Sequence, residues 1–236
     1  MKKKILIFDF DGTLTPYPST RYEILAKAGY TIERGNKEYQ EVLDEGYGYL
    51  DGYYEFFLRA LKKGGVPLND ESVAYGADKV EYNEGVETFL SKLQDKSLEE
   101  LNCYILSSGF RTYLQNINIR KYFKDVFGTT MKYNNGVIEG IDLSLDEKMK
   151  VDIIKEILAL EGKNDNDCSE VYYVGDGLTD VHAMRYVKSN GGTSIFIVHK
   201  NDMSVYDKLK KDNVVDLAFS TDFSKGKGIY DYFIKE

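Results

Sequence analysis

The first hydrophobic segment of the chain has the length of a single strand. The apolar run starts at Ile5 and reaches Phe10 with one interruption, at Asp9, before the turn residues that follow Asp11. Apolar side chains on both faces are typical of a strand that is buried in a parallel sheet. We therefore predict a buried first strand with carboxylates at its end.

Residues 16–82 show helical periodicity and no strand alternation. Glycine, proline and capping residues separate the pieces, and we expect helices over 21–28, 52–63 and 69–82. In the second of these, the apolar side chains share one face of a helix: Tyr53, Phe56, Phe57, Ala60 and Leu61. The pattern predicts an all-α insertion after the first strand.

From residue 83 onward, short apolar runs alternate with helical segments. We expect strands over 103–106, 129–133, 137–141, 171–174, 194–198 and 214–219. We expect helices over 84–96, 111–117, 148–160 and 178–187, and one at the C-terminus. The Asn134-Asn135-Gly136 segment is a strong hairpin signal. Strands that alternate with helices predict an α/β fold with a doubly wound parallel sheet.

The composition limits the kinds of partner. The chain has 236 residues, with 31 Lys and Arg against 39 Asp and Glu, which gives a formal net charge of −8. This balance argues against broad binding to nucleic acid or to an anionic membrane, because both need a basic face. A small phosphorylated metabolite remains possible as a partner, since it needs only a local positive site.

Cysteine usage and hydropathy indicate the compartment. Cys103 and Cys168 cannot form a disulfide framework, and no Cys/His cluster has zinc spacing. The N-terminal apolar run is too short for a signal peptide, and no segment approaches the roughly 18 apolar residues of a membrane span. We predict a cytoplasmic protein that makes no membrane contact, as a monomer or homodimer.

Polar residues follow three of the predicted strands. These ends are Asp9 with Asp11, Ser107-Ser108-Gly109, and Gly175-Asp176-Gly177 with Asp180. In open α/β sheets, ligands bind beyond the carboxyl ends of the strands. We therefore expect one site that is built from all three strand ends.

Asp9 and Asp11 are two residues apart on a strand, so their side chains project to the same face. Two close carboxylates repel each other, and burial makes their charge costly unless a cation neutralises them. Asp176 can reach the same cation, and oxygen ligands without Cys or His favour Mg²⁺. Two other interpretations stay open: a solvated Asp pair in a turn, and a helix-capping role for Asp180.

The second strand end has the character of a phosphate site. Ser107, Ser108 and Gly109 combine small hydroxyls with a flexible backbone that leads into a helix, where N–H groups can bind phosphate. Lys148 or Lys150 would add the positive partner that phosphoryl oxygens need. A helical lysine is usually just solvated, so neither indicates a site by itself.

Together these segments resemble the motifs of the haloacid dehalogenase superfamily of phosphatases and phosphotransferases. The segments occur in family order: Asp9-Phe10-Asp11-Gly12-Thr13, Leu106-Ser107-Ser108-Gly109-Phe110, a Lys within 148–150, and Gly175-Asp176-Gly177-Leu178-Thr179-Asp180. Residues 83–88 and 150–154 also resemble the phosphoserine phosphatase-like branch. The resemblance implies a Rossmann-like core of residues 1–15 and 83–236, with residues 16–82 as an inserted helical cap.

The resemblance also implies roles for the carboxylates. Asp9 is then the nucleophile that forms an aspartyl-phosphate, and Asp11 is the general acid/base, oriented by Thr13. Mg²⁺ is held by Asp9, by the backbone carbonyl of Asp11 and by Asp176, with Asp180 in support.

The phosphate ligands follow from the same resemblance. Ser107 binds the phosphoryl group together with Ser108 and Gly109. Alignment of residues 150–154 makes Lys150 the lysine ligand, with Lys148 as the second choice.

The chain departs from phosphoserine-specific members of the family. Those members carry a Glu soon after the nucleophile and an Arg in the cap, whereas here the nearest acid is Glu23 and the corresponding helix has only Arg59. The cap is rich in aromatic residues: Tyr47, Tyr49, Tyr53, Tyr54, Phe56 and Phe57. These could bind an apolar or cationic leaving group, or could pack the cap's own core.

We therefore expect a Mg²⁺-dependent phosphatase that acts on a small phosphomonoester. One alternative is a phosphotransferase, in which a second alcohol instead of water accepts the phosphoryl group. Another is a non-catalytic phosphate-binding protein, because a fold alone does not establish activity. We assign no role to His182 or His199, because most histidines of this kind lie at the surface.

Overall fold

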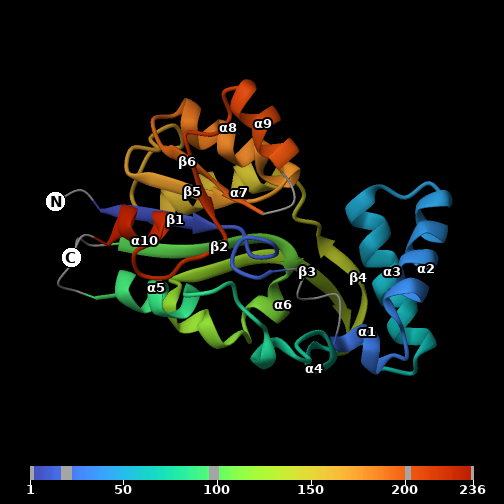
Figure 1. Cartoon of the computed structure of the whole chain (residues 1–236). Helices are drawn as coiled ribbons and strands as arrows, with labels where there is room; N and C mark the ends of the chain where they lie inside the picture. The colour runs from blue at the N-terminus through green and yellow to red at the C-terminus, as the bar shows by residue number, and fades with distance from the viewer. Residues whose placement is uncertain (1–2, 17–22, 96–100, 200–202, 235–236) are drawn as a thin grey trace.

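Seven strands form one sheet in the order β4-β3-β2-β1-β5-β6-β7 (Figure 1). The computed structural model describes residues 3–16, 23–95, 101–199 and 203–234. The strands are β1 (Lys4–Phe8), β2 (Leu101–Phe110), β3 (Asp125–Asn134), β4 (Val137–Leu143), β5 (Val171–Gly175), β6 (Thr193–Val198) and β7 (Leu217–Ser220). Every neighbouring pair is parallel except β3 and β4, so the predicted α/β class is confirmed.

Helices lie on both faces of the sheet and beside it. The α-helices are α1 (Glu23–Lys27), α2 (Ile32–Asp44), α3 (Tyr49–Lys63), α4 (Asp70–Val73), α5 (Val86–Leu93), α6 (Arg111–Leu114), α7 (Met149–Leu160), α8 (Val181–Ser189), α9 (Met203–Lys211) and α10 (Gly228–Phe233). Short 3-10 helices are η2 (Ala77–Lys79), η3 (Asn118–Tyr122) and η4 (Leu178–Asp180).

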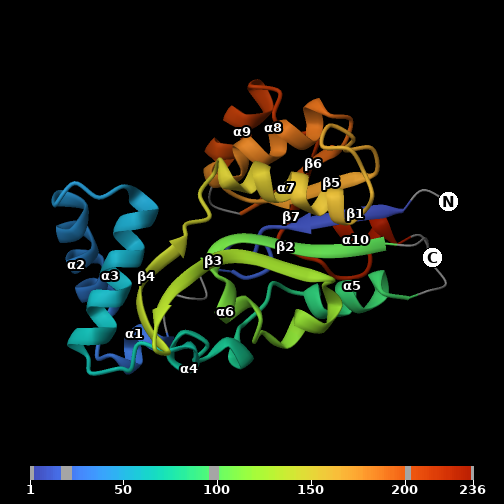
Figure 2. The ribbon, with the colours of Figure 1, turned by 180° about the vertical axis from the view of Figure 1, so that it is seen from behind.

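The sheet is doubly wound, with β1 at its centre. Helices α7, α8 and α9 cover one face, whereas α5, α6 and α10 cover the other, as the two opposite views show (Figures 1 and 2). The four apolar residues from Ile5 to Phe8 are completely buried. Leu6 and Phe8 belong to the apolar core on one face, and Ile5 and Ile7 to the core on the other. Their alternation explains why the run is apolar on both faces.

The β3–β4 hairpin forms where the sequence predicts it. Asn135 and Gly136 have φ values of 48° and 80°. Two successive positive φ angles are what a tight primed turn requires, and Asn-Gly adopts them at low cost. The two strands pair in antiparallel fashion at the edge of the sheet.

Several sequence expectations differ from the structure. Strand β2 continues to Phe110, well beyond the expected 103–106. The helix expected over 69–82 stops at Val73, because Gly76 has a φ of 83° and cannot continue an α-helix. Helices α2 and α9 were not among the helices expected over defined residues. Residues 21–22 and 96, at the ends of two expected helices, lie outside the described residues.

Helices α1, α2 and α3 stand beside the sheet, next to β4 (Figures 1 and 2). Phe57 of α3 contacts the core through Phe110 at the end of β2, with ring centroids 4.7 Å apart. The α4 segment lies against α6, where Thr112 donates a hydrogen bond to Asp70 at 3.3 Å. The division into a core of residues 1–15 and 83–236 and a cap of residues 16–82 stays a proposal.

We find no helix of the described residues that has both the length and the apolar character needed to span a membrane.

Candidate active site

The register of the sheet brings three strand ends together. Phe8 of β1 lies opposite Ile105 of β2 and Val174 of β5. The Asp9 N–H then donates to the Val174 carbonyl at 2.8 Å. Ser107 lies two residues beyond Ile105, and Asp176 lies two residues beyond Val174. The predicted convergence of polar strand ends therefore follows from the strand pairing.

The turn after β1 is closely packed against the end of β5. Gly12 has a φ of 83°, and a Cβ atom there would lie 2.2 Å from Asp176 Oδ2, so only glycine fits. The buried Thr13 hydroxyl donates to Asp176 Oδ1 at 2.9 Å. Thr13 thus contacts Asp176, whereas the sequence suggested that it orients Asp11. The Asn83 amide donates to the carbonyls of Thr13 and Thr15, which anchors the turn.

Lys150 is the positive centre of the site and is 1% exposed. Its Nζ donates to Asp9 Oδ1 at 2.9 Å and to Asp180 Oδ1 at 2.7 Å. Burial alone would lower the pKa of Lys150, but the two carboxylates outweigh it and raise that pKa well above the ordinary value. The ammonium therefore keeps its charge. Lys148 is exposed at the start of α7 and does not line the cavity that Lys150 lines.

Asp180 is completely buried and holds several groups at once. Its Oδ1 accepts from the Tyr173 hydroxyl at 2.6 Å as well as from Lys150. Its Oδ2 accepts from the backbone N–H groups of Asp176 and Gly177 at 3.2 and 3.1 Å. Asp180 therefore orders the backbone after β5, and its bond from the Gly177 N–H is the kind of contact that the helix-capping interpretation predicts.

The carboxylates form a group that fits a hard cation. One oxygen from each of Asp9, Asp176 and Asp180 lies within 4.8 Å of the others. Burial raises the pKa of Asp9 well above its ordinary value, more than the ammonium of Lys150 lowers it. Burial also raises the pKa of Asp176. Buried carboxylates in excess of nearby positive charge are stabilised by a cation, and a donor set of oxygens suits Mg²⁺.

The Ser107-Ser108-Gly109 segment lies inside β2 and not in a loop after it. Pairing between β2 and β3 shifts register between Leu106 and Phe110, which lets the strand bulge here. Ser107 is buried, and its Oγ accepts from the Gly109 N–H at 3.1 Å. The Ser108 Oγ donates to the Leu145 carbonyl at 2.8 Å. The segment is thus held by specific hydrogen bonds, where the sequence suggested a flexible backbone.

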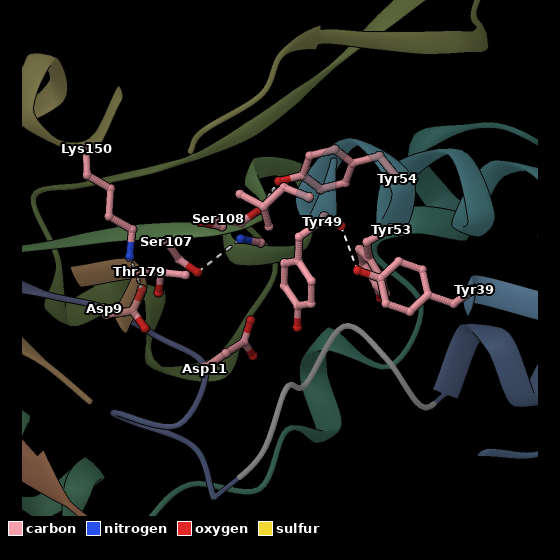
Figure 3. Close-up of a pocket in the computed structure, with 12 residues that line it drawn as sticks. Asp9, Asp11, Tyr39, Tyr49, Tyr53, Tyr54, Ser107, Ser108, Lys150 and Thr179 are labelled. Atoms are coloured by element: carbon pink, nitrogen blue, oxygen red, sulfur yellow. Dashed lines mark hydrogen bonds and ion pairs between the residues drawn. The ribbon is translucent and has the colours of Figure 1, made fainter. Parts of the chain in front are cut away.

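A cavity of about 230 Å³ opens between this site and the helices beside the sheet (Figure 3). From the core, its lining residues are Asp9, Asp11, Ser107, Ser108, Gly109, Lys150 and Thr179. From α2 and α3, they are Tyr39, Tyr49, Leu50, Tyr53 and Tyr54. The predicted nucleophile, acid/base and phosphate ligands therefore face one space.

The residues considered for substrate specificity are Glu23, Arg59 and the aromatic residues of the helical insertion, and only some of them line the cavity. Neither Glu23 nor Arg59 is among the described residues that line this cavity. The Arg59 guanidinium instead pairs with Glu45 and Glu55, at 2.7 Å in each case. Of the aromatic residues singled out from the sequence, Tyr49, Tyr53 and Tyr54 line the cavity, whereas Phe56 and Phe57 are buried in the apolar core. Tyr39 of α2 also lines the cavity, although the sequence did not single it out.

His199 contacts the site through Asp176, which the sequence did not predict. Its Nε2 lies 3.2 Å from Asp176 Oδ2. His199 directly follows β6, which is the next strand beside β5, so the rule that ligands bind at carboxyl ends would have selected it. His182, by contrast, lies at the surface near Glu147.

Comparisons with known proteins agree with this geometry. A sequence model of the haloacid dehalogenase-like hydrolases matches residues 6–185. A phosphoserine phosphatase of Methanocaldococcus jannaschii is 27% identical over 186 residues, which cover 76% of this chain and 80% of its own. A phosphoethanolamine/phosphocholine phosphatase of Gallus gallus is 24% identical over 193 residues, which cover 75% of this chain and 68% of its own.

Solved structures share the fold. A structure described as a phospho-aspartyl intermediate analogue of phosphoserine phosphatase superposes with a TM-score of 0.61 at 24% identity. The match covers 92% of this chain and 93% of the other. At this identity the likeness concerns the fold alone.

Proposed function

The chain belongs to the haloacid dehalogenase-like hydrolases, and from that premise we propose that it is a Mg²⁺-dependent phosphatase of small phosphomonoesters. The observation that carries the proposal is the meeting of Asp9, Asp11, Ser107 and Lys150 around one cavity. Relatives named for phosphoserine and for phosphoethanolamine or phosphocholine act on small esters of this kind. A cavity of about 230 Å³ has room for such a molecule.

In the proposed reaction, Asp9 attacks the phosphorus atom and forms an aspartyl-phosphate, which divides one difficult hydrolysis into two steps. Asp11 gives a proton to the leaving alcohol and then takes one from the water that attacks the intermediate. Lys150 donates to Asp9 and so holds this carboxylate in place, while its charge attracts the phosphoryl oxygens. The Ser107 hydroxyl supplies a further contact to those oxygens.

The metal would be held by Asp9, Asp176 and the backbone carbonyl of Asp11, with Asp180 in support. When bound, Mg²⁺ offsets the repulsion between the carboxylates and the phosphoryl group. Thr13 and His199 both contact Asp176 and fix the orientation of its carboxylate.

The test is phosphate release from a panel of small phosphomonoesters, with and without Mg²⁺, for the wild type and for Asp9→Asn. We expect Mg²⁺-dependent release that the substitution abolishes, because an amide is no nucleophile towards phosphorus. Circular dichroism of the variant checks that the fold is retained. Substantial hydrolysis by pure Asp9→Asn protein would overturn the assignment of the nucleophile.

The same assay tests the alternatives. Transfer to an added alcohol in preference to water would indicate a phosphotransferase. Phosphate binding without any release would indicate a binding protein. A cytoplasmic location and a monomeric or homodimeric state stay predictions from the sequence.

A further inference from the structure

The wall of the cavity that faces the carboxylates consists of tyrosine rings and Leu50. Tyr39 comes from α2, and Tyr49, Tyr53 and Tyr54 come from α3. Figure 3 shows these rings on the side of the cavity away from Asp9 and Lys150. A substrate whose phosphoryl group lies at Asp9 would therefore extend its leaving group towards the tyrosines.

The rings are held in fixed relative positions. Tyr39 packs edge-on against Tyr49 and Tyr53, with centroids 5.9 and 6.0 Å apart. The Tyr39 hydroxyl donates to the Tyr49 carbonyl at 2.7 Å, which ties α2 to the start of α3. Tyr49 is nevertheless 70% exposed. A large ring that lines a cavity while remaining exposed is available to a ligand, whereas Tyr54 is buried in the packing.

The charges around the tyrosines favour a cation. In the cavity itself, the ammonium of Lys150 is already paired with Asp9 and Asp180. A second cavity of about 440 Å³ adjoins the first, because both are lined by Tyr49, Leu50 and Thr179. It adds three carboxylates and one lysine: Asp51, Asp146, Glu147 and Lys148. The adjoining space, which Tyr49 also lines, is therefore predominantly acidic.

A carboxylate on the leaving group would find no cationic partner in the tyrosine wall. Among the described residues that α2 and α3 contribute to the lining, none carries a positive charge. Arg59, the arginine of α3, is held by Glu45 and Glu55. The phosphate ester of an amino acid carries such a carboxylate, so the wall disfavours it.

From the tyrosine wall and its acidic surroundings, we infer that the substrate is the phosphate ester of an alkylated amino alcohol. The inference rests on the proposed phosphatase function and names the substrate class for it. A quaternary ammonium is weakly hydrated, and it is attracted to the negative faces of tyrosine rings. Asp51 and its neighbours add long-range attraction for the same charge.

The experiment compares kcat/KM for phosphocholine with that for 3,3-dimethylbutyl phosphate, in which a carbon atom replaces the quaternary nitrogen. The two esters have the same shape and differ in charge. Because several ring contacts act on one cation, we expect phosphocholine to be favoured about tenfold or more. Phosphoserine, assayed beside them, should be a poorer substrate than phosphocholine.

Variants then locate the selectivity. Tyr49→Leu should reduce the preference for phosphocholine over the neutral ester several-fold, whereas Tyr49→Phe, which keeps the ring, should largely retain it. Tyr47→Leu is the matched control. Tyr47 lies two residues earlier and is 40% exposed, but it faces Arg59 and does not line the cavity.

The outcomes separate this inference from the function on which it rests. Equal kcat/KM for the charged and neutral esters, or a preference for phosphoserine, would overturn the inference while the phosphatase function stands. An unchanged preference in folded Tyr49→Leu would also contradict it. Absence of Asp9-dependent release from every ester would instead overturn the proposed phosphatase function.

Discussion

Lys150 decides the electrostatic balance of the site, because its ammonium is buried between Asp9 and Asp180. Such an ion pair is costly to break, since removal of one partner leaves the other charges buried and uncompensated. The neighbouring Lys148, two residues earlier, is exposed and has no part in this arrangement. The two lysines that the sequence left as alternatives therefore differ in environment.

We predict that Lys150→Met lowers the free energy of unfolding by about 3–5 kcal/mol, because Asp9 and Asp180 lose their buried partner. It should also reduce kcat/KM by about a hundredfold or more, because a positive contact to the phosphoryl group is lost. Urea unfolding and phosphate release measure the two effects. Lys148→Met is the control and should change stability by less than about 0.5 kcal/mol. If Lys148→Met and Lys150→Met changed stability and kcat/KM equally, the role given to Lys150 would be wrong.

At the scale of elements, a hydrogen-bond network connects α3 to the core. The Tyr54 hydroxyl donates to the Ser108 carbonyl at 2.8 Å and lies 2.7 Å from the Thr129 Oγ1 atom. Thr129 in turn accepts from the Leu145 N–H at 3.1 Å, in the segment before α7. Burial raises the pKa of Tyr54 to about 12, so the hydroxyl remains a donor at neutral pH. The network joins α3, β2 and β3 around the Ser107-Ser108-Gly109 segment.

We predict that Tyr54→Phe lowers the free energy of unfolding by about 1 kcal/mol, the usual value of one hydrogen bond. Because the bond also holds the backbone next to Ser107, kcat/KM should fall several-fold. Tyr30→Phe is a matched control, since the Tyr30 hydroxyl donates to Glu38 of α2 at 2.6 Å and does not line the cavity. Tyr30→Phe should lower the free energy of unfolding and leave kcat/KM unchanged. Identical kinetics for both variants would show that the bond is structural only.

At the scale of the whole molecule, a second charged cluster lies at the amino ends of β1 and β2, opposite the site. The Glu161 side chain is 2% exposed and accepts from Asn102, Tyr104, Lys124 and Lys3. Burial by itself would raise the pKa of Glu161, but these partners outweigh it and lower that pKa to about 2. The ionised carboxylate therefore stabilises this end of the fold.

The pH dependence follows from the lowered pKa. A free glutamate has a pKa of about 4.3, so the stabilisation is complete above about pH 4.3 and is lost as the pH falls towards 2. We predict that Glu161→Gln lowers the free energy of unfolding by about 1–3 kcal/mol at neutral pH, and by less near pH 3. Urea unfolding at both pH values measures this. Glu156→Gln, at an exposed position of α7, the helix that Glu161 directly follows, is the control. If Glu161→Gln lowered the free energy of unfolding equally at both pH values, the prediction would be wrong.

Local patterns in the sequence are enough to predict the fold class and the strand ends of the site. The apolar run from Ile5 to Phe8 could be recognised because burial on both faces excludes polar residues from it. Asp9, Ser107 and Asp176 could be selected because carboxyl ends of parallel strands share one edge. These are local patterns and general rules of topology, so one chain is enough to read them.

Which side chains share the cavity follows only from the packing of the elements. The family resemblance preferred Lys150 over Lys148, but the packing is what shows that Lys150 is buried and Lys148 exposed. His199 approaches Asp176 across neighbouring strands, and Arg59 is held by Glu45, which lies fourteen residues earlier. Such contacts depend on distances between segments that are remote in sequence. Periodicity and spacing do not contain those distances, because they are set when the elements pack together.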